Sequence, residues 1–441
     1  MTRSERAADP NRAREAVWEK RQILFDQHGR NPALSHGAHE VRKLVLLLSA
    51  SRSGSSLLFQ LLAGSGDFLT PLGEETPFYR LAKIGDIETP DDSDAVRTGT
   101  LREEQKKKLV IGIIGDLGRL SKNGSEFPLQ DFALDCAQRL LLQWPELDLD
   151  PEEIHESARR NLSEELERGD FDVIRFWMKW LSRLKQEGKD VSPELYDIQR
   201  NPGQGRVPLP ARFIEEPPFI VPAPRLHASA RDLATRTVLL KSPANCYRMP
   251  LIRELFPNAQ IRVVFLTRNP GASISGLMDG WTSDRFHSRN VAGVSPLRIE
   301  GYTSEERPGS REWWKFDLPP GWHRMTQRPL PEVCAFQWMS ANRSVLSDPL
   351  ARGDSFLQIR YENLLEPESL DRELRRILEF AGSDSITAPV NPPPAVMTVN
   401  PPRKRKWLER RSLIDAALSD AEVQATARQL GYEIAERMSW P

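Results

Sequence analysis

The feature that most constrains the fold is a short apolar run that ends in a small, hydroxyl-rich loop and continues as a helical pattern. The run, 44–48 (LVLLL), is followed by the loop 51–56 (SRSGSS) and then by LLFQLLAGSG. A continuous apolar run of this length is typical of a buried strand, and Ser, Arg and Gly interrupt it before the helical pattern begins. The segment therefore predicts a strand, a tight loop and a helix, in that order.

Three further runs predict buried strands of the same sheet. They are 237–241 (TVLLK), 261–267 (IRVVFLT) and 356–361 (FLQIRY), and helical patterns lie between them. Strands that alternate with helices form a parallel sheet covered on both faces. We therefore expect an α/β fold, a three-layer sandwich with a central parallel sheet.

A long stretch, 86–234, interrupts this alternation with mostly helical segments and a Pro-rich passage. We interpret it as a helical insertion that caps the site and not as an independent catalytic domain. The remaining chain then divides into an N-terminal helical extension, 1–40, and an α/β core formed by 41–85 and 235–441.

A second irregular region, 282–331, is rich in aromatic residues. Counting the residue at its edge, it holds four of the 11 tryptophans, Trp281, Trp313, Trp314 and Trp322. Aromatic residues in a long loop line an acceptor pocket or anchor the loop to the core, and the sequence leaves both possibilities open.

Composition excludes several classes of protein. Sixty-one Lys and Arg residues against 62 Asp and Glu residues give a net charge of −1, so no overall basic field points to nucleic acid. The longest apolar run is far too short to cross a bilayer, and no apolar stretch follows the N-terminal charges, so we expect a cytoplasmic protein without a membrane partner. Cys136, Cys246 and Cys334 are too widely spaced to predict a disulfide framework or a zinc site.

The loop 51–56 has the residue types of an anion site. Backbone N–H groups at a helix start cradle phosphate or sulfate, Gly54 permits close approach, and serine hydroxyls add donors. A plain strand-to-helix turn with a serine cap would use the same residues. The loop lacks the GK[ST] of a Walker A motif, which counts against an NTPase.

A second anion site is indicated where the run 261–267 ends. Arg268 follows that run, Pro270 starts a new helical pattern, and Ser273 and Ser275 lie in its first turns. Open α/β sheets bind ligands at this edge. A structural ion pair of Arg268 is the competing interpretation.

With both segments the chain resembles the sulfotransferases that use 3′-phosphoadenosine 5′-phosphosulfate (PAPS). The family's first loop, [KR]-S-G-[ST]-[ST], is similar to 52–56, and its FP-[ND]-A-hydrophobic-R-[ND]-P segment is similar to 256–270. The resemblance extends to LLKSPANCYR and IRYENLL; it covers roughly 41–79 and 238 to the end, and leaves both long insertions unmatched. It implies a P-loop NTPase-like sulfotransferase fold, PAPS as donor, 3′,5′-ADP as product and no metal.

The resemblance also implies the donor-binding residues. The residues expected on the 5′-phosphosulfate are Arg52, Ser53, Gly54, Ser55 and Ser56, and Arg268 is expected on the 3′-phosphate. The family's 3′-phosphate serine corresponds to Gly276 here, so Ser275 or Ser273 takes its place. Tyr361 is similar to a residue beside the adenine, and burial against the core is the alternative. The basic run Arg403, Lys404 and Arg405 resembles a segment that closes over the 3′-phosphate, although an ordinary solvated run would look the same.

Sulfuryl transfer needs a base for the acceptor proton and positive groups where negative charge accumulates. Gly73-Glu74-Glu75-Thr76 resembles a GEET segment of tyrosylprotein sulfotransferases, in which the second Glu is the base, and this points to Glu75. A solvated acidic turn or a helix cap is the alternative, and His287 is the rival base. By the same resemblance, Lys241 and Arg52 stabilise the sulfuryl group and the leaving phosphate.

The sequence thus predicts transfer of a sulfuryl group from PAPS to a hydroxyl or amine of a small-molecule acceptor, such as a secondary metabolite. A peptide or protein tyrosine sulfotransferase is one alternative. A P-loop nucleotide kinase or NTPase, or a catalytically silent nucleotide-binding protein, are alternatives of other classes.

Overall fold

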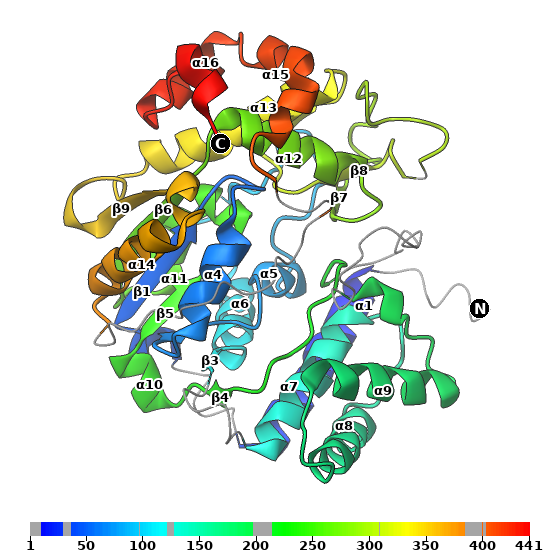
Figure 1. The fold of residues 1–441 in the computed structure, drawn as a ribbon. Coiled ribbons are helices and arrows are strands. Elements are labelled where there is room, and N and C mark those ends of the chain that lie inside the picture. Colours follow the sequence, from blue (N-terminus) through cyan, green and yellow to red (C-terminus); the bar gives the residue numbers. More distant parts are fainter. Residues whose placement is uncertain are drawn as a thin grey trace.

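The computed structural model describes residues 10–29, 37–96, 98–120, 128–196, 214–307, 309–383, 399 and 403–441. Within this part of the chain, a five-stranded parallel sheet forms the centre (Figure 1). Its strand order is β2-β5-β1-β6-β9, with the bounds β1 (Lys43–Leu48), β2 (Phe68–Leu69), β5 (Thr237–Leu240), β6 (Gln260–Thr267) and β9 (Phe356–Arg360). The predicted α/β fold with a central parallel sheet is confirmed, and β2 is a strand too short for the sequence pattern to reveal.

The apolar run that dominates the sequence forms the middle strand, β1. Lys43 pairs with Thr237 of β5 on one side and with Gln260 of β6 on the other, and both pairings are parallel. A strand with neighbours on both edges and layers on both faces needs apolar side chains throughout. Because β5 and β6 follow each other in the chain but flank β1, a crevice forms at the carboxyl end of β1.

Helices cover both faces of the sheet. Val45 and Leu47 share a hydrophobic cluster with α4 (Ser55–Gly64) and α14 (Pro367–Ala381). Leu46 belongs to the cluster on the other face, with α11 (Met249–Leu255) and α13 (Leu330–Ser347). Alternate side chains of one strand therefore pack into different layers, as the period of two requires.

The other elements lie around this sandwich. The remaining α-helices are α1 (Pro10–Gln27), α3 (Gly37–Glu40), α5 (Thr76–Leu81), α6 (Glu103–Gly115), α7 (Leu129–Gln143), α8 (Pro151–Leu166), α9 (Val173–Gln186), α10 (Ala230–Thr235), α12 (Pro270–Thr282), α15 (Arg411–Ala417) and α16 (Ala421–Gln429). Two small antiparallel pairs are β3 (Gly118–Arg119) with β4 (Leu226–His227), and β7 (His287–Asn290) with β8 (Trp313–Lys315). Short 3-10 helices include η2 (Pro243–Tyr247), η5 (Tyr361–Leu364) and η6 (Lys406–Arg410).

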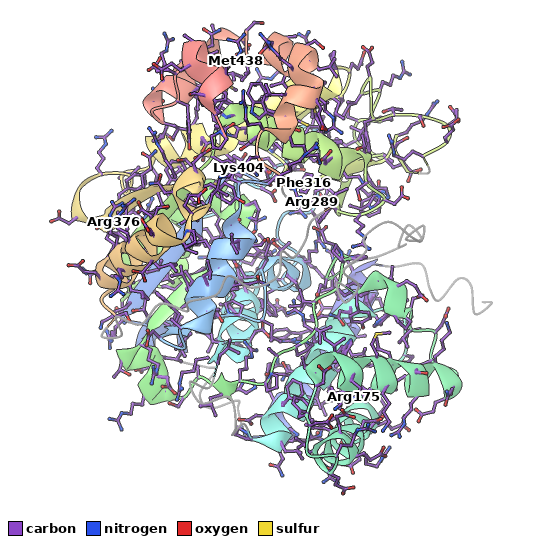
Figure 2. The ribbon with its side chains drawn as sticks, in the orientation of Figure 1. Arg175, Arg289, Phe316, Arg376, Lys404 and Met438 are labelled. Carbon is purple, nitrogen blue, oxygen red and sulfur yellow. The ribbon has the colours of Figure 1, made fainter. Side chains whose placement is uncertain are left out.

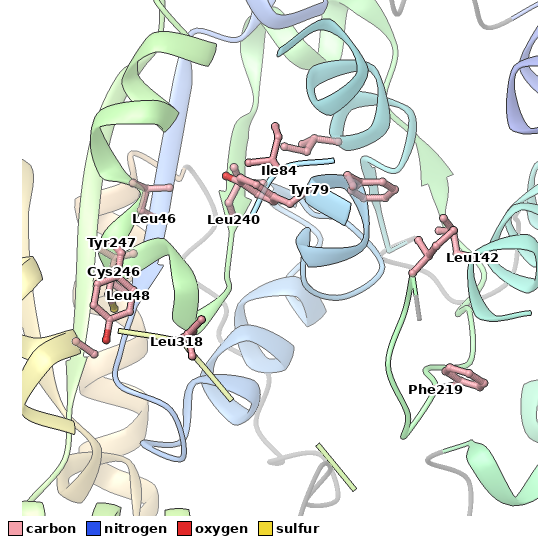
Figure 3. Packing of buried hydrophobic residues seen from close by; sticks show 14 of the residues in the cluster. Leu46, Leu48, Tyr79, Ile84, Leu142, Phe219, Leu240, Cys246, Tyr247 and Leu318 are labelled. Atoms are coloured by element: carbon pink, nitrogen blue, oxygen red, sulfur yellow. The ribbon is translucent and has the colours of Figure 1, made fainter. Parts of the chain in front are cut away.

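The stretch 86–234 contains the expected helices, α6 to α9, and it packs closely on the α/β core. One buried cluster runs from Leu46 and Leu240 of the sheet through Tyr79 to Leu142 and Phe219 of this stretch (Figure 3). A bridge between Thr70 and Gly118 also ties it to the end of β2. The helices of this stretch are thus part of the main core, while the domain boundaries given above stay a prediction.

The tryptophans of the region 282–331 are anchors of that region. Trp281, Trp314 and Trp322 are fully buried and Trp313 is 8% exposed. The indole N–H groups of the first three donate to Gln337, to the Asp317 carbonyl and to the Asp92 carbonyl. In the described part of the chain, no helix is both long and apolar enough to span a membrane.

Candidate functional site

A cavity of about 460 Å³ lies at the carboxyl ends of the sheet strands. Arg52 follows β1, Lys241 follows β5, Arg268 follows β6 and Tyr361 follows β9, and all four line this cavity. The predicted crevice thus brings together residues from four strands that are far apart in the sequence.

The loop 51–56 leaves the start of α4 open toward this cavity. Gly54 is the N-cap of α4 with φ 92°, and no side chain caps the helix. A Cβ at Gly54 would lie 2.2 Å from the ring of Tyr361, so only glycine allows the ring to cover the loop. Ser55 and Ser56 line the cavity beside it. The first N–H groups of α4 are therefore placed as an anion cradle.

Two guanidinium groups lie at this cradle. The Arg268 Nη1 donates to the Arg52 carbonyl at 3.0 Å, and the Arg268 guanidinium lies 4.5 Å from the centre of the Tyr361 ring. The Arg52 guanidinium lies 5.4 Å from the centre of the Phe286 ring and 6.0 Å from that of Phe316. Burial, followed by the charge of Arg268, lowers the pKa of Arg52 to about 10, which keeps it protonated near neutral pH. An anion between the two groups would relieve their repulsion.

The end of β5 contributes a lysine paired with a carboxylate. The Lys241 Nζ lies 2.5 Å from Glu74 Oε1 and donates to Ser56 Oγ at 3.3 Å. Lys241 is 6% exposed and lines the cavity together with Glu74. The segment Glu74-Glu75 therefore presents its first carboxylate to the cavity.

Glu75, the base predicted from the resemblance, has different surroundings. It is fully buried, does not line the cavity, and its Oε1 accepts a hydrogen bond from Asn245 Nδ2. Burial raises the pKa of Glu75 above its usual value. Glu75 occupies the N-cap position of α5, but its side chain makes no capping bond. Its role as base stays a prediction.

The rival base, His287, lies in β7 and does not line the cavity either. It is 7% exposed, and burial together with the charge of Lys315 lowers its pKa to about 3. An imidazole with so low a pKa is a weak proton acceptor at neutral pH.

The serines and the basic run divide between the cavity and its surroundings. Ser275 lines the cavity, whereas Ser53 and Ser273 are buried side by side with their Oγ atoms 3.5 Å apart. Arg403 and Arg405 line the cavity. Lys404 (Figure 2) does not; it pairs with Glu366 at 2.5 Å on the surface.

Gly276, at the position where the resemblance expects a serine, also lines the cavity. A Cβ there would lie 3.4 Å from Arg52 Cβ, an ordinary contact. The structure therefore has room for a side chain at the position where the resemblance expects a hydroxyl.

Sequence reasoning missed several cavity residues. Asp317 accepts hydrogen bonds from Ser51 Oγ at 2.5 Å and from the Tyr247 hydroxyl at 2.9 Å, and burial raises its pKa to about 6. Asp279 pairs with Lys406 at 2.5 Å and with Arg410 at 2.7 Å, which fixes the C-terminal segment on α12. Because these carboxylates lie far in the sequence from their partners, no local sequence pattern marks them as cavity residues.

Phe286 and Phe316, the second of which is labelled in Figure 2, were missed for another reason. Their rings stack at 5.2 Å, and both residues have left-handed backbones with φ 63°. Of the five non-glycine residues with positive φ in the described chain, four line this cavity, namely Arg52, Phe286, Phe316 and Arg405. Such strained backbones concentrate at functional sites and leave no trace in residue type.

The far side of the cavity is lined by ion pairs. Arg80 lies 3.1 Å from Glu216, Arg139 lies 2.5 Å from Glu215, and Arg289 lies 2.6 Å from Asp94. Among the described residues, no group of three or more His, Cys, Asp and Glu side chains is arranged to hold a metal ion.

Comparison with known proteins gives a structural likeness. No protein-family model matches the chain, and no curated protein matches it. Among solved structures, it is similar to a sulfotransferase domain from the curacin biosynthetic pathway, with 15% identity over 89% of this chain and 99% of that one and a TM-score of 0.33. It is also similar to a sulfotransferase domain of the Synechococcus PCC 7002 olefin synthase, with 16% identity over 90% and 97% and a TM-score of 0.36.

Proposed function

We propose that this protein is a sulfotransferase that moves the sulfuryl group of PAPS to a hydroxyl or amine of a small-molecule acceptor. One observation carries the proposal. Arg52, Lys241 and Arg268, which follow three adjacent strands, converge with the open start of α4 on a single cavity. This arrangement suits a ligand with two anionic groups, as a 3′-phosphorylated nucleotide has.

The cavity residues fit such a donor. The start of α4, with Ser55, Ser56 and Arg52, would hold the 5′-phosphosulfate. The residues that would hold the 3′-phosphate and the adenine are Arg268, Ser275, Arg403, Arg405 and Tyr361. Bound there, PAPS supplies an already activated sulfuryl group.

The chain's own residues would then support in-line transfer. Lys241 and Arg52, which line the cavity, would stabilise negative charge on the leaving phosphate and the sulfuryl oxygens. A carboxylate of the Glu74-Glu75 turn would take the acceptor proton. The resemblance favours Glu75, and the contact with Lys241 together with the position in the cavity favours Glu74.

Calorimetric titration tests the proposal directly. We expect 3′,5′-ADP to bind without Mg²⁺ and more tightly than ATP. Because Arg268 would hold the 3′-phosphate, R268A should weaken 3′,5′-ADP binding by about 10- to 100-fold, since a charge-assisted contact contributes roughly 1.5–3 kcal/mol.

R375A is the matched control. It removes an exposed arginine of α14 whose partner is Asp371, away from the cavity lining. If R268A bound 3′,5′-ADP as tightly as wild type, the proposed donor site would be contradicted. A preference for Mg-ATP would replace sulfuryl transfer by phosphoryl transfer.

A further inference from the structure

Lys315 is a buried lysine that the proposed mechanism does not use. It lies at the end of β8, is 1% exposed and does not line the cavity. A buried amino group costs free energy unless hydrogen bonds replace the water that it loses. The contacts of the Lys315 Nζ should therefore have a structural consequence nearby.

The Lys315 Nζ bridges the two ends of one turn. It donates to the carbonyl of Ser283 and, at 2.6 Å, to the carbonyl of Arg285. Ser283 is the C-cap of α12, and its Oγ accepts from the Arg285 N–H at 3.3 Å. Because α12 ends at Thr282 and β7 begins at His287, Lys315 closes the connection between this helix and this strand.

These two contacts do not depend on the charge of Lys315. Burial, the largest effect on this group, lowers its pKa to about 7. The ammonium has three N–H donors and the neutral amine has two, so either form can bond both carbonyls. The bridge should therefore persist on both sides of neutral pH.

The turn leads directly to a strained residue. Phe286 follows Arg285 and has a left-handed backbone with φ 63°, as does Phe316 (Figure 2), which follows Lys315. A left-handed backbone is unfavourable for a bulky side chain and is retained only where neighbouring contacts hold it. Lys315 supplies such a contact on the residue before Phe286 and is itself the residue before Phe316.

The two aromatic rings connect this turn to the donor site. They stack with their centres 5.2 Å apart, and the Arg52 guanidinium lies 5.4 Å from the centre of the Phe286 ring. Arg52 lines the cavity, where it is expected on the 5′-phosphosulfate. A series of direct contacts thus runs from Lys315 through the turn and Phe286 to Arg52.

We propose that Lys315 is a positioning residue of the donor site, an inference that rests on the proposed function. By bonding the two carbonyls of the turn 283–285, it holds the Phe286 ring against Arg52 before the donor binds. A site that is already ordered binds its ligand more tightly, because less freedom is lost on binding.

The substitution K315M removes the N–H donors and keeps a long side chain. We expect it to weaken 3′,5′-ADP binding to the full-length protein by about tenfold in calorimetry. K179M, which removes an exposed lysine of α9 that pairs with Glu164 at 3.1 Å, is the matched control and should bind as wild type does. A folded K315M with wild-type affinity would overturn the inference.

A double-mutant cycle separates positioning from general damage to the structure. In an F286L background, K315M should lower the affinity by no more than about twofold, because the ring that Lys315 holds is already absent. In an R405A background it should keep its full effect, because Arg405 is expected on the 3′-phosphate and donates to the Met438 carbonyl. Equal losses in the two backgrounds would contradict the proposed role.

Hydrogen exchange of the wild-type protein tests the same coupling if K315M does not fold. Coupling between two sites is reciprocal, so bound 3′,5′-ADP should slow exchange in peptides that contain 283–286 by about tenfold. The exposed turn 167–170, between α8 and α9, is the reference and should not change. Unchanged exchange at 283–286 in the nucleotide complex would overturn the inference. Failure of wild type to bind 3′,5′-ADP would instead overturn the sulfotransferase proposal, and this inference with it.

Discussion

Glu74 and Glu75 are consecutive residues with opposite surroundings. Glu74 lies against Lys241 in the cavity, whereas Glu75 turns into the interior against Asn245. A group that removes a proton must reach the acceptor oxygen, either directly or through one water molecule. On this ground the two carboxylates should contribute unequally to turnover, although their residue types are identical.

Isosteric variants of this pair distinguish the two roles. We expect E74Q to lower kcat by about 100-fold or more, the range found for loss of a general base, while E75Q retains most of it. Single-turnover rates with saturating PAPS give the comparison, and 3′,5′-ADP affinity checks that each donor site is intact. A large loss in E75Q with near-normal turnover in E74Q would identify Glu75 as the base, as the sequence resemblance predicts.

Asp317 gives a pH dependence of stability. Burial raises its pKa from 3.8 to about 6, so the folded protein binds more protons than the unfolded chain between these values. The stability linked to Asp317 is therefore fully present below about pH 4 and lost as pH rises through 6. Between pH 4 and 7, the free energy of unfolding of D317N should therefore rise by roughly 2–3 kcal/mol relative to that of wild type.

Urea unfolding at a series of pH values measures this difference. The constant offset caused by changed hydrogen bonds to Ser51 and Tyr247 does not affect the slope. M438A, a change at an exposed and non-titrating residue, serves as the reference. A free-energy difference between D317N and wild type that is flat across this range would show that Asp317 does not titrate there.

At the scale of elements, the pair β7–β8 brings two aromatic rings to the predicted anion site. Phe286 directly precedes β7 and Phe316 directly follows β8, and their stacked rings lie beside the Arg52 guanidinium. The approach is close because Gly280 of α12 has no side chain; a Cβ there would lie 2.1 Å from the Phe316 ring. The two rings beside this strand pair thus hold the Arg52 side chain in position, although they do not belong to the loop 51–56.

Removing one ring should weaken donor binding without disturbing the fold. A desolvated cation–π contact contributes about 1–2 kcal/mol, so F286L should reduce 3′,5′-ADP affinity by about 5- to 30-fold in calorimetry. F380L removes the ring beside Arg262, which does not line the cavity, and is the matched control. Equal affinities of the two variants would mean that the rings do not position Arg52.

The elements themselves could be predicted because their signals are local. The apolar runs of β1, β5, β6 and β9 and the loop before α4 are each contained in fewer than about ten residues. The cavity lining depends on contacts between distant segments, such as Asp317 with Ser51. No spacing rule links these residues, and no residue type marks the left-handed backbones of Phe286 and Phe316.

At the scale of the whole molecule, the helices of 86–234 share their core with the sheet. Trp177 of α9 is fully buried, contacts the rings of Trp180 and Tyr196, and belongs to the same hydrophobic cluster as Leu46 of β1. A continuous core couples its parts, because loss of packing in one region exposes apolar surface in the next. The part of the cavity wall that 214–220 forms should therefore unfold together with the donor site.

A substitution that creates a void in the core far from the donor site tests this coupling. W177A should cost about 3–5 kcal/mol and lower the midpoint of one calorimetric unfolding transition, because the truncated side chain leaves a void in the shared core. The same transition should rise in temperature when 3′,5′-ADP is added, since the ligand binds only the folded protein. L413A, at a residue that is 51% exposed, should change the midpoint little. Two separate transitions, of which only one responds to the nucleotide, would show that the helices of 86–234 unfold independently of the donor site.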